Sequence, residues 1–224
     1  GFRTSGFSLT LTSLDPGATI YYTLDGSEPD ENNLSGTTYA YKKSYPELPG
    51  QAFGPFFQNS FQTLQYSSPI AIVDRSSQPN KLANISTTFD FAPDYFPNGP
   101  IFKGTVVRAK TVKAGALSSK TVTKNYFITP QGASRFSIPV ISLSFDENDF
   151  YDYTDGISVA GIDFDTWRLA NPTEEVNENL GNFNRSGDAY ERVANLNYFV
   201  NGNEVVKQKV GLRIHGDYSR LYPS

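Results

Sequence analysis

The chain has 224 residues, a formal net charge of −4 and no cysteine. Its length allows one large domain or two small ones. The missing cysteines exclude disulfides and thiolate metal sites, and the acidic balance gives no electrostatic reason to expect nucleic acid or an anionic membrane as a partner. The chain also lacks a run of about 18 apolar residues, so we expect no membrane span.

The composition indicates the fold class. The chain contains 14 tyrosines and 17 phenylalanines, together with many threonine, serine, glycine and proline residues and no long helical periodicity. Aromatic and β-branched residues favour strands, and glycine and proline favour the turns between them. We therefore predict a mainly β protein.

Two strands and a tight turn are predicted near the N-terminus. Residues 7–12 (FSLTLT) alternate apolar and polar side chains, as a half-buried strand does. A second alternating run, in residues 18–30 (ATIYYTLDGSEPD), ends at Asp25 and Gly26. The aspartate can accept hydrogen bonds from downstream N–H groups, and the glycine can adopt a positive φ. Pro29 ends the strand because proline has no N–H to donate.

Two irregular stretches interrupt the strand pattern. Residues 31–64 and 74–102 mix proline, glycine and asparagine with aromatic residues, and each is too long for an ordinary sandwich loop. Strand patterns return at residues 66–72 (YSSPIAI), 104–112 (GTVVRAKTV) and 119–128 (SKTVTKNYFI).

The order of these motifs resembles a known module. The TLDGSEP turn, the Tyr-x-x-Pro-Ile segment, TVVRAKTV and its closing strand resemble, in this order, the chitobiase/hexosaminidase C-terminal-like module of bacterial surface proteins. The resemblance covers residues 7–127 and implies an immunoglobulin-like or fibronectin-III-like β-sandwich at residues 1–128. Because the module is usually shorter, the resemblance also implies that residues 31–64 and 74–102 are insertions.

The second part of the chain begins after a polar segment. Residues 129–137 (TPQGASRFS) predict a linker between domains. Residues 138–145 predict a strand, and Asp146 is placed to cap a short helix. Residues 190–215 predict a β-hairpin whose turn is Asn201-Gly202, a pair typical of type I′ turns. Residues 163–188 are polar and irregular.

A second resemblance covers residues 138–224. The segments IPVISLSFDENDF, DGISVAG, YERVANLNYFVNG and VGLRIHGDYSR resemble, in this order, the start of a CotH-type (spore-coat protein H) kinase-like domain. This resemblance implies a bacterial extracellular or cell-surface protein with a partial, hairpin-rich α+β segment. We expect the chain to be a piece of a longer protein, whose remainder is the partner of this region.

Two functions follow from these resemblances. The first is a non-catalytic spacer or positioning module that also contacts cell-surface polysaccharide. The alternative is the N-terminal lobe of an atypical CotH-type kinase, in which Gly216, Ser219 and Arg220 contact nucleotide phosphates. In the CotH family, the lysine and the metal-binding acids follow the segment that corresponds to residues 216–220. We therefore expect ATP and Mg²⁺ to bind only in the longer protein. In residues 1–224 we expect neither a catalytic residue nor a cofactor. A glycoside hydrolase accessory role is a third interpretation, by analogy of fold alone.

Aromatic residues suggest where a sugar would bind. Trp167, in a polar segment, and Tyr39, Tyr41 and Tyr45, in the first insertion, are candidates because an amphipathic ring stacks on the apolar face of a pyranose. The alternative is that these rings pack the insertion and the polar segment against the rest of the protein.

Other polar residues do not form a recognisable site. The acidic run DENDFYDYTDG, residues 146–156, lacks the spacing of an EF-hand loop and is interpreted as a helix cap and a solvated helix face. His215 is the single histidine, so it has no histidine or cysteine with which to bind a metal ion. We therefore predict no metal site.

Overall fold

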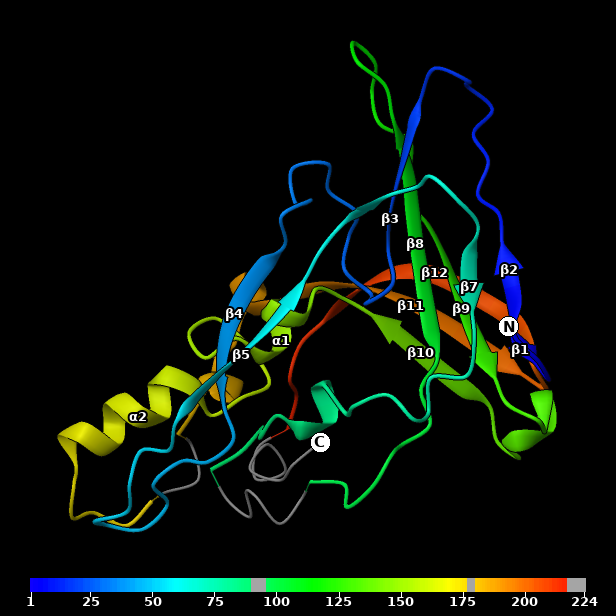
Figure 1. Cartoon of the computed structure of the whole chain (residues 1–224). Helices are drawn as coiled ribbons and strands as arrows, with labels where there is room; N and C mark the ends of the chain where they lie inside the picture. Colours follow the sequence, from blue (N-terminus) through cyan, green and yellow to red (C-terminus); the bar gives the residue numbers. More distant parts are fainter. Residues whose placement is uncertain (90–95, 177–179, 217–224) are drawn as a thin grey trace.

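The computed structural model describes residues 1–89, 96–176 and 180–216. The protein is mainly β, as its composition predicts, and the described residues form four sheets and few helices. Figure 1 shows two regions side by side: strands gathered around β8 (Thr105–Val112), and a lobe that contains β4 (Thr37–Lys42), β5 (Phe56–Phe61), α1 (Glu147–Tyr151) and α2 (Gly161–Ala170). Within the described residues, no helix has the length and apolar character needed to cross a membrane.

The first region contains the β-sandwich. One sheet has the order β1-β9-β8-β3-β6, formed by Phe2–Arg3, Val122–Ile128, Thr105–Val112, Thr19–Thr23 and Leu64–Gln65. The second pairs β2 (Phe7–Leu9) with β7 (Ile70–Ile72). A hydrophobic core joins them, because alternate residues of each strand point to one face. Its buried members are Ile70, Ile72, Val107 and Ile128.

The other face of the five-stranded sheet is also buried, but it is polar. Thr23, Arg108, Thr123 and Asn125 lie on this face and are at most 3 % exposed. They alternate along β3, β8 and β9 with the residues that fill the apolar core. A third layer covers this polar face.

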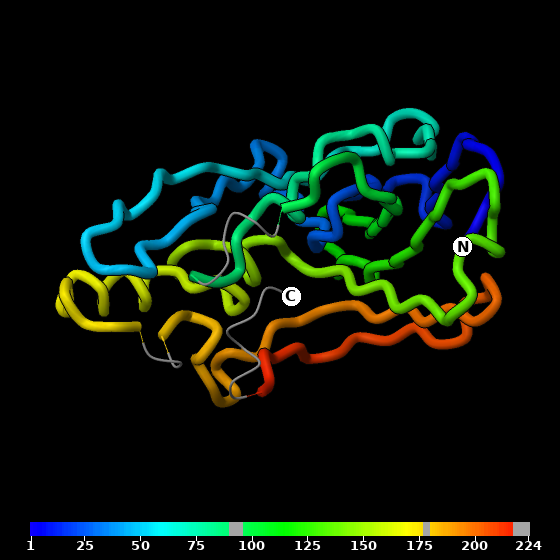
Figure 2. Tube along the Cα trace, turned by 90° about the horizontal axis from the view of Figure 1, so that it is seen from below, coloured from blue at the N-terminus to red at the C-terminus, as the bar shows by residue number. Residues whose placement is uncertain are grey.

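The third layer is an antiparallel sheet with the order β10-β11-β12. Its strands are Val140–Ser144, Arg192–Val200 and Asn203–Leu212. The predicted turn is confirmed: Asn201 and Gly202 have φ values of 50° and 79°. Figure 2 shows β11 and β12 as a separate layer beneath the sandwich. Phe199 of β11 packs edge-on against Phe2 and Phe127, which fixes this layer on the sandwich.

The lobe combines both irregular stretches with the segment after β10. The β4-β5 hairpin (Thr37–Lys42 and Phe56–Phe61) lies beside α1 (Glu147–Tyr151) and α2 (Gly161–Ala170). Short 3₁₀ helices complete the structure: η1 (Leu82–Asn84), η2 (Gly132–Arg135), η3 (Asn182–Asn184) and η4 (Asp188–Tyr190).

Two hydrophobic cores hold the lobe together. One contains Tyr45, Phe89, Ala160, Phe164 and Phe183. The other contains Tyr39, Tyr41, Phe61, Ile85 and Val159. Each core takes side chains from both sides of residues 129–137. The division into domains at 1–128 and 138–224 stays a prediction, but in this structure the two parts share buried surface.

Some local predictions differ from the structure. The strand expected at residues 7–12 is shorter, ending at Leu9. The stretch 163–188, expected to be irregular, contains most of α2, whose buried face includes Asp165 and Arg168 and therefore has no apolar periodicity. Asp146 precedes α1, yet it forms no side-chain cap, because its carboxylate accepts a hydrogen bond from the Glu28 N–H, 2.6 Å away.

Candidate functional site

The β4-β5 hairpin and the segment 43–55 between its strands form an arm, which we call the docking arm (residues 37–61). Its contact with α2 centres on Lys42. The Lys42 side chain is 1 % exposed, and its Nζ lies 2.5 Å from the Asp165 carboxylate. The Tyr153 hydroxyl donates to the same oxygen at 2.9 Å. A buried charge is tolerated when it is paired and hydrogen-bonded in this way.

Aromatic rings enclose the Lys42 ammonium. The ring centroids of Tyr45, Phe53, Phe56 and Tyr153 lie between 4.8 and 5.8 Å from Nζ. The faces of aromatic rings attract cations, and the attraction is stronger where water is excluded. Burial also raises the pKa of the Tyr45 and Tyr153 hydroxyls, so both hydroxyls are neutral at physiological pH.

Arg168 provides a second polar connection between α2 and the docking arm. Its guanidinium donates to the carbonyl oxygens of Pro46, at 3.0 Å, and Glu47, at 2.7 Å. The same side chain donates to the carbonyls of Asn171 and Glu174. One buried arginine therefore fixes the tip of the arm, the helix and the loop that follows it.

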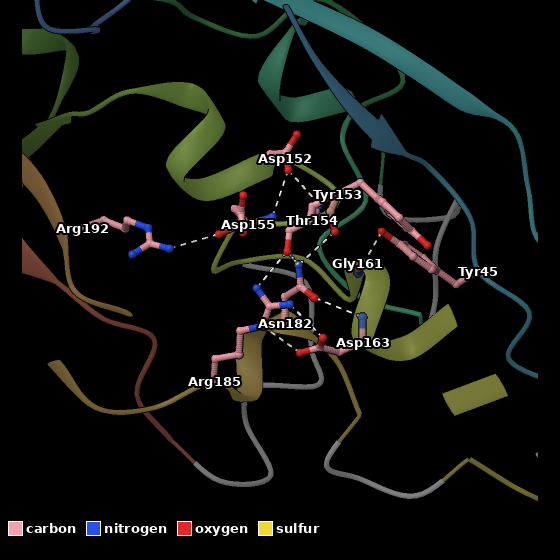
Figure 3. Close-up of polar contacts among 10 residues, drawn as sticks. All are labelled: Tyr45, Asp152, Tyr153, Thr154, Asp155, Gly161, Asp163, Asn182, Arg185 and Arg192. Atoms are coloured by element: carbon pink, nitrogen blue, oxygen red, sulfur yellow. Dashed lines mark hydrogen bonds and ion pairs between the residues drawn. The ribbon is translucent and has the colours of Figure 1, made fainter. Parts of the chain in front are cut away.

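A network of polar contacts holds the start of α2 (Figure 3). The Asn182 side chain donates to the carbonyls of Tyr153 and Thr154 and accepts from the Asp163 N–H. Arg185 forms a bidentate pair with the Asp163 carboxylate, with both distances 2.8 Å. The Gly161 N–H donates to the Tyr45 hydroxyl at 3.1 Å, so the network also reaches the docking arm.

Glu147 connects α1 to both irregular stretches. Its carboxylate accepts hydrogen bonds from Tyr39, at 2.9 Å, and Lys81, at 2.7 Å. Burial raises the pKa of the Glu147 carboxyl even though the Lys81 ammonium opposes that shift. Desolvation therefore outweighs the ion pair, as it often does at buried carboxylates.

The TLDGSEP turn contacts the second part of the chain as well. Asp25 accepts a hydrogen bond from the Ser27 N–H at 3.0 Å, and Gly26 has φ 97°, as predicted. The buried Arg108 of β8 donates to the Gly26 carbonyl and pairs with Glu28. Because Glu28 also donates its N–H to Asp146, the turn bridges β8 and the start of α1.

The predicted sugar-binding tyrosines require a correction. Tyr39, Tyr41 and Tyr45 are only 4, 7 and 6 % exposed, and they belong to the two cores of the lobe. Their rings cannot stack on a sugar because other side chains already cover their faces. The alternative interpretation, that these rings pack the insertion, fits the structure. Trp167 lies on α2 and is half-buried, with the Arg168 guanidinium 4.7 Å from its ring centroid.

The predicted phosphate contacts lie at the end of the described chain. Gly216 follows β12 and has φ 127°, a conformation that favours glycine. Ser219 and Arg220 lie outside the described residues, so the structure does not test their role. Among residues 1–89, 96–176 and 180–216, no group of three or more acidic, histidine or cysteine side chains is arranged to hold a metal ion.

The buried pair Lys42–Asp165 is the main feature that the sequence did not reveal. The two residues are 123 positions apart, and neither lies in a recognisable motif. The sequence feature most closely related to this pair is the high aromatic content of residues 39–57. That content predicts a packed insertion, but it does not predict that a lysine is buried within it.

Comparison with known families identifies the first part of the chain. A family model described as Fn3 associated matches residues 9–126, more than half of the 224 residues. The match runs from β2 to β9 and includes the docking arm. No curated protein and no solved structure matches the chain. The sandwich, its TLDGSEP turn and this match agree with the chitobiase-like module that the sequence predicts, and the chain belongs to the Fn3-associated family.

Proposed function

We propose that the chain is a rigid positioning module of a bacterial extracellular or cell-surface CotH-type protein. The Fn3-associated family indicates an accessory or spacer module. The finer proposal is that the sandwich holds residues 138–224 in one orientation, so that the β10-β11-β12 sheet and Gly216 have a fixed place relative to the rest of the protein.

The buried Lys42–Asp165 pair carries this proposal. A flexible spacer needs only an exposed linker, whereas this chain places an ammonium and a carboxylate in an apolar enclosure between the docking arm and α2. Such a pair is costly to separate, because moving the arm would leave each charge buried without its partner. The Arg168 contacts and the two shared cores oppose the same movement.

Distance measurement between spin labels tests the rigidity. Because the chain has no cysteine, Leu14→Cys and Leu169→Cys introduce two unique label sites, both at exposed side chains. One label then reports on the sandwich and the other on α2. We expect one narrow distance distribution. A broad distribution in the labelled chain without further substitutions would overturn the positioning role.

A matched pair of variants links the rigidity to the docking arm. Lys42→Met in the labelled chain should broaden the distribution, because the arm then loses its partner on α2. Lys113→Met removes a lysine from an exposed pair with Asp15 on the sandwich and should leave the distribution narrow. If both variants behave alike, the buried pair does not set the orientation.

The kinase-lobe alternative has one observation in its favour. The β12 strand ends at Leu212, and Gly216, which has a positive φ, follows shortly after it, where a turn covering phosphates could begin. In this alternative, ATP and Mg²⁺ bind only when further residues supply a lysine and acids. Titration of MgATP against residues 1–224 should show no turnover, and tight binding to this chain would place the nucleotide site elsewhere than proposed.

The polysaccharide contact that we propose at Trp167 can be tested separately. Trp167→Ala should reduce retention of the chain on insoluble bacterial wall polysaccharide. Phe136→Ala removes another partly exposed aromatic ring, on the sandwich side, and serves as the control. Equal retention of both variants and the parent chain would remove Trp167 as a sugar contact.

A further inference from the structure

A cleft opens between the edge of the sandwich and the third layer, away from the docking arm. It has a volume of 750 Å³, within the range of about 300–1,000 Å³ that is usual for ligand sites. One wall is formed by β8 and the segment 118–121 that leads to β9, and the other by β11 and β12. In Figure 1 the third layer crosses behind β8 and β9, and the Lys124–Glu204 ion pair joins β9 to β12 beside the cleft.

The lining of this cleft is strongly basic. Lys110, Lys120, Lys207 and Lys209 face it, against the single carboxylate of Glu28. Glu28 is already engaged by Arg108 and by the Thr121 hydroxyl. This concentration of positive charge stands out because the whole chain has a net charge of −4. A basic cleft on an acidic protein selects anionic ligands by charge.

The lysines differ in what they contact. Lys110 pairs with Glu31 at 2.8 Å. Within the described residues, Lys120, Lys207 and Lys209 form no ion pair. Lys207 and Lys209 are two positions apart on β12, so they point to the same side of the strand. Burial, and next the neighbouring Lys124, lower the pKa of the Lys207 ammonium, so a bound anion would relieve an unfavourable concentration of charge.

Asn195 gives an independent indication of a ligand. It lies on β11, lines the cleft and is only 7 % exposed. Within the described residues, its side-chain Nδ2 has no hydrogen-bond partner. A buried amide without a hydrogen-bond partner is unfavourable, so most such groups in native proteins have one. The Nδ2 atom itself is closed to solvent, so a small turn of the side chain toward the cleft would bring it to an oxygen atom of a ligand.

We propose that this cleft binds a carboxylated oligosaccharide, with its carboxylates against Lys120, Lys207 and Lys209 and an oxygen atom on Asn195. The lysine ammonium groups attract the carboxylates as point charges, which requires no fixed bidentate geometry. The remaining lining is rich in hydroxyl and amide groups, from Ser118, Ser119, Thr121 and Gln208, which suit the hydroxyls of a sugar. The inference deepens the proposed polysaccharide contact, but it does not depend on Trp167 or on the docking arm.

Calorimetric titration with short oligogalacturonides tests the proposal. We expect binding that weakens as salt is added, because exposed charges are screened, and no binding of the methyl-esterified oligomers, which lack the charge. Polyphosphate and poly-glutamate of matched charge are the comparison ligands. Equal or tighter binding of either polymer would overturn the assignment to a carboxylated sugar.

Variants place the binding in the cleft. Lys207→Gln with Lys209→Gln should weaken oligogalacturonide binding about tenfold or more. Lys113→Gln with Arg213→Gln removes the same charge from exposed positions outside the cleft and should change affinity by less than about twofold. Equal effects of the two pairs would show that binding follows net charge alone, which would overturn the site.

Asn195 allows a finer test. Asn195→Ala removes the unpartnered amide and should weaken binding, while Asn195→Gln, which keeps an amide, should weaken it less. Circular dichroism of each variant confirms that the fold is retained. Trp167→Ala should leave the affinity unchanged, so a failure of the cleft proposal is distinguishable from a failure of the Trp167 contact.

Discussion

At the scale of single residues, the energetics of this protein centre on charges that are buried and paired. Lys42 is enclosed by aromatic rings and contacts one carboxylate oxygen of Asp165. Within the described residues, the other oxygen of Asp165 has no partner. A buried ion pair of this kind contributes little net stability. Breaking it is nevertheless costly in free energy, because one charge is then buried without its partner.

Removing one partner of this pair should be strongly destabilising. Lys42→Met leaves Asp165 charged and buried without its cation, so we expect the free energy of unfolding to fall by about 3–5 kcal/mol. Lys113→Met, which breaks an exposed pair, should change it by less than about 1 kcal/mol. Urea denaturation of both variants measures the difference.

A double variant tests whether the effects of Lys42 and Asp165 on stability are coupled. Lys42→Met with Asp165→Leu replaces both charges by apolar side chains, which is often neutral in a buried site. We therefore expect it to be more stable than Lys42→Met alone. A double variant as unstable as the sum of the two single variants would show that the residues are not coupled.

Glu147 should make stability depend on pH. Its pKa is raised in the folded protein, chiefly by burial, so the folded state binds a proton more tightly than the unfolded state does. Between the unfolded pKa of about 4 and the raised folded pKa, stability should therefore fall as pH rises.

Comparison with Glu147→Gln isolates this contribution from the other carboxyls. The free energy of unfolding, measured by urea denaturation across the mildly acidic range, should decline more steeply with rising pH in the parent chain than in the variant. Parallel curves would contradict the assignment of the slope to Glu147.

At the scale of elements, the start of α2 depends on Gly161, which lies in close contact with the Asn182 side chain. Gly161 has φ 60°, and a Cβ there would lie 2.3 Å from the Asn182 amide and 2.6 Å from the Tyr153 carbonyl oxygen. Asn182 in turn provides the hydrogen bonds that join α2 to the segment 153–154. The helix is therefore positioned by this contact, with no side-chain hydrogen bond at its N-cap.

Two glycine-to-alanine substitutions distinguish the cost of a positive φ from the cost of a steric clash with Asn182. Gly115→Ala places alanine at φ 76° with no atom within 4 Å of its Cβ, so it should cost about 1–2 kcal/mol. Gly161→Ala adds overpacking and should cost about 1–3 kcal/mol more than Gly115→Ala. Thermal or urea unfolding measures the stability of both variants. Equal losses of stability would show that the Asn182 side chain moves away from the new Cβ at no cost in free energy.

At the scale of the whole molecule, the segment 129–137 joins two parts that also contact each other elsewhere. The shared cores and the polar contacts of Lys42, Arg168 and Glu147 span it. Cutting the chain in this segment removes only one of many connections. The sequence alone suggests that a cut here would release a stable fragment ending near residue 130, and the structure changes that expectation.

Cleavage should leave the two pieces associated. A protease recognition sequence inserted after Ser137, an exposed position, allows the cut to be made in the folded protein. We expect both pieces to co-elute in gel filtration, and Lys42→Met to weaken their association. If the fragment 1–137 elutes alone from the otherwise unaltered chain, the shared cores do not hold the parts together.

Elements whose signals are local could be predicted from the amino-acid sequence. The strands β3, β8 and β9 follow from alternation and β-branched residues, and the turns at Asp25-Gly26 and Asn201-Gly202 follow from residues that tolerate positive φ. Family membership follows from the order of these same motifs. Each signal lies within a few residues, so no knowledge of distant contacts is needed.

The packing of the irregular segments could not be predicted in this way, because it depends on contacts between distant residues. Whether Tyr39 faces solvent or a core depends on α1, more than 100 residues later in the chain. The same holds for Lys42, whose partner lies on a helix with no apolar periodicity, and for the basic cleft, which arises where β8 and β12 come together. Burial and charge pairing are properties of residues brought together from distant positions, and local sequence patterns do not encode such proximity.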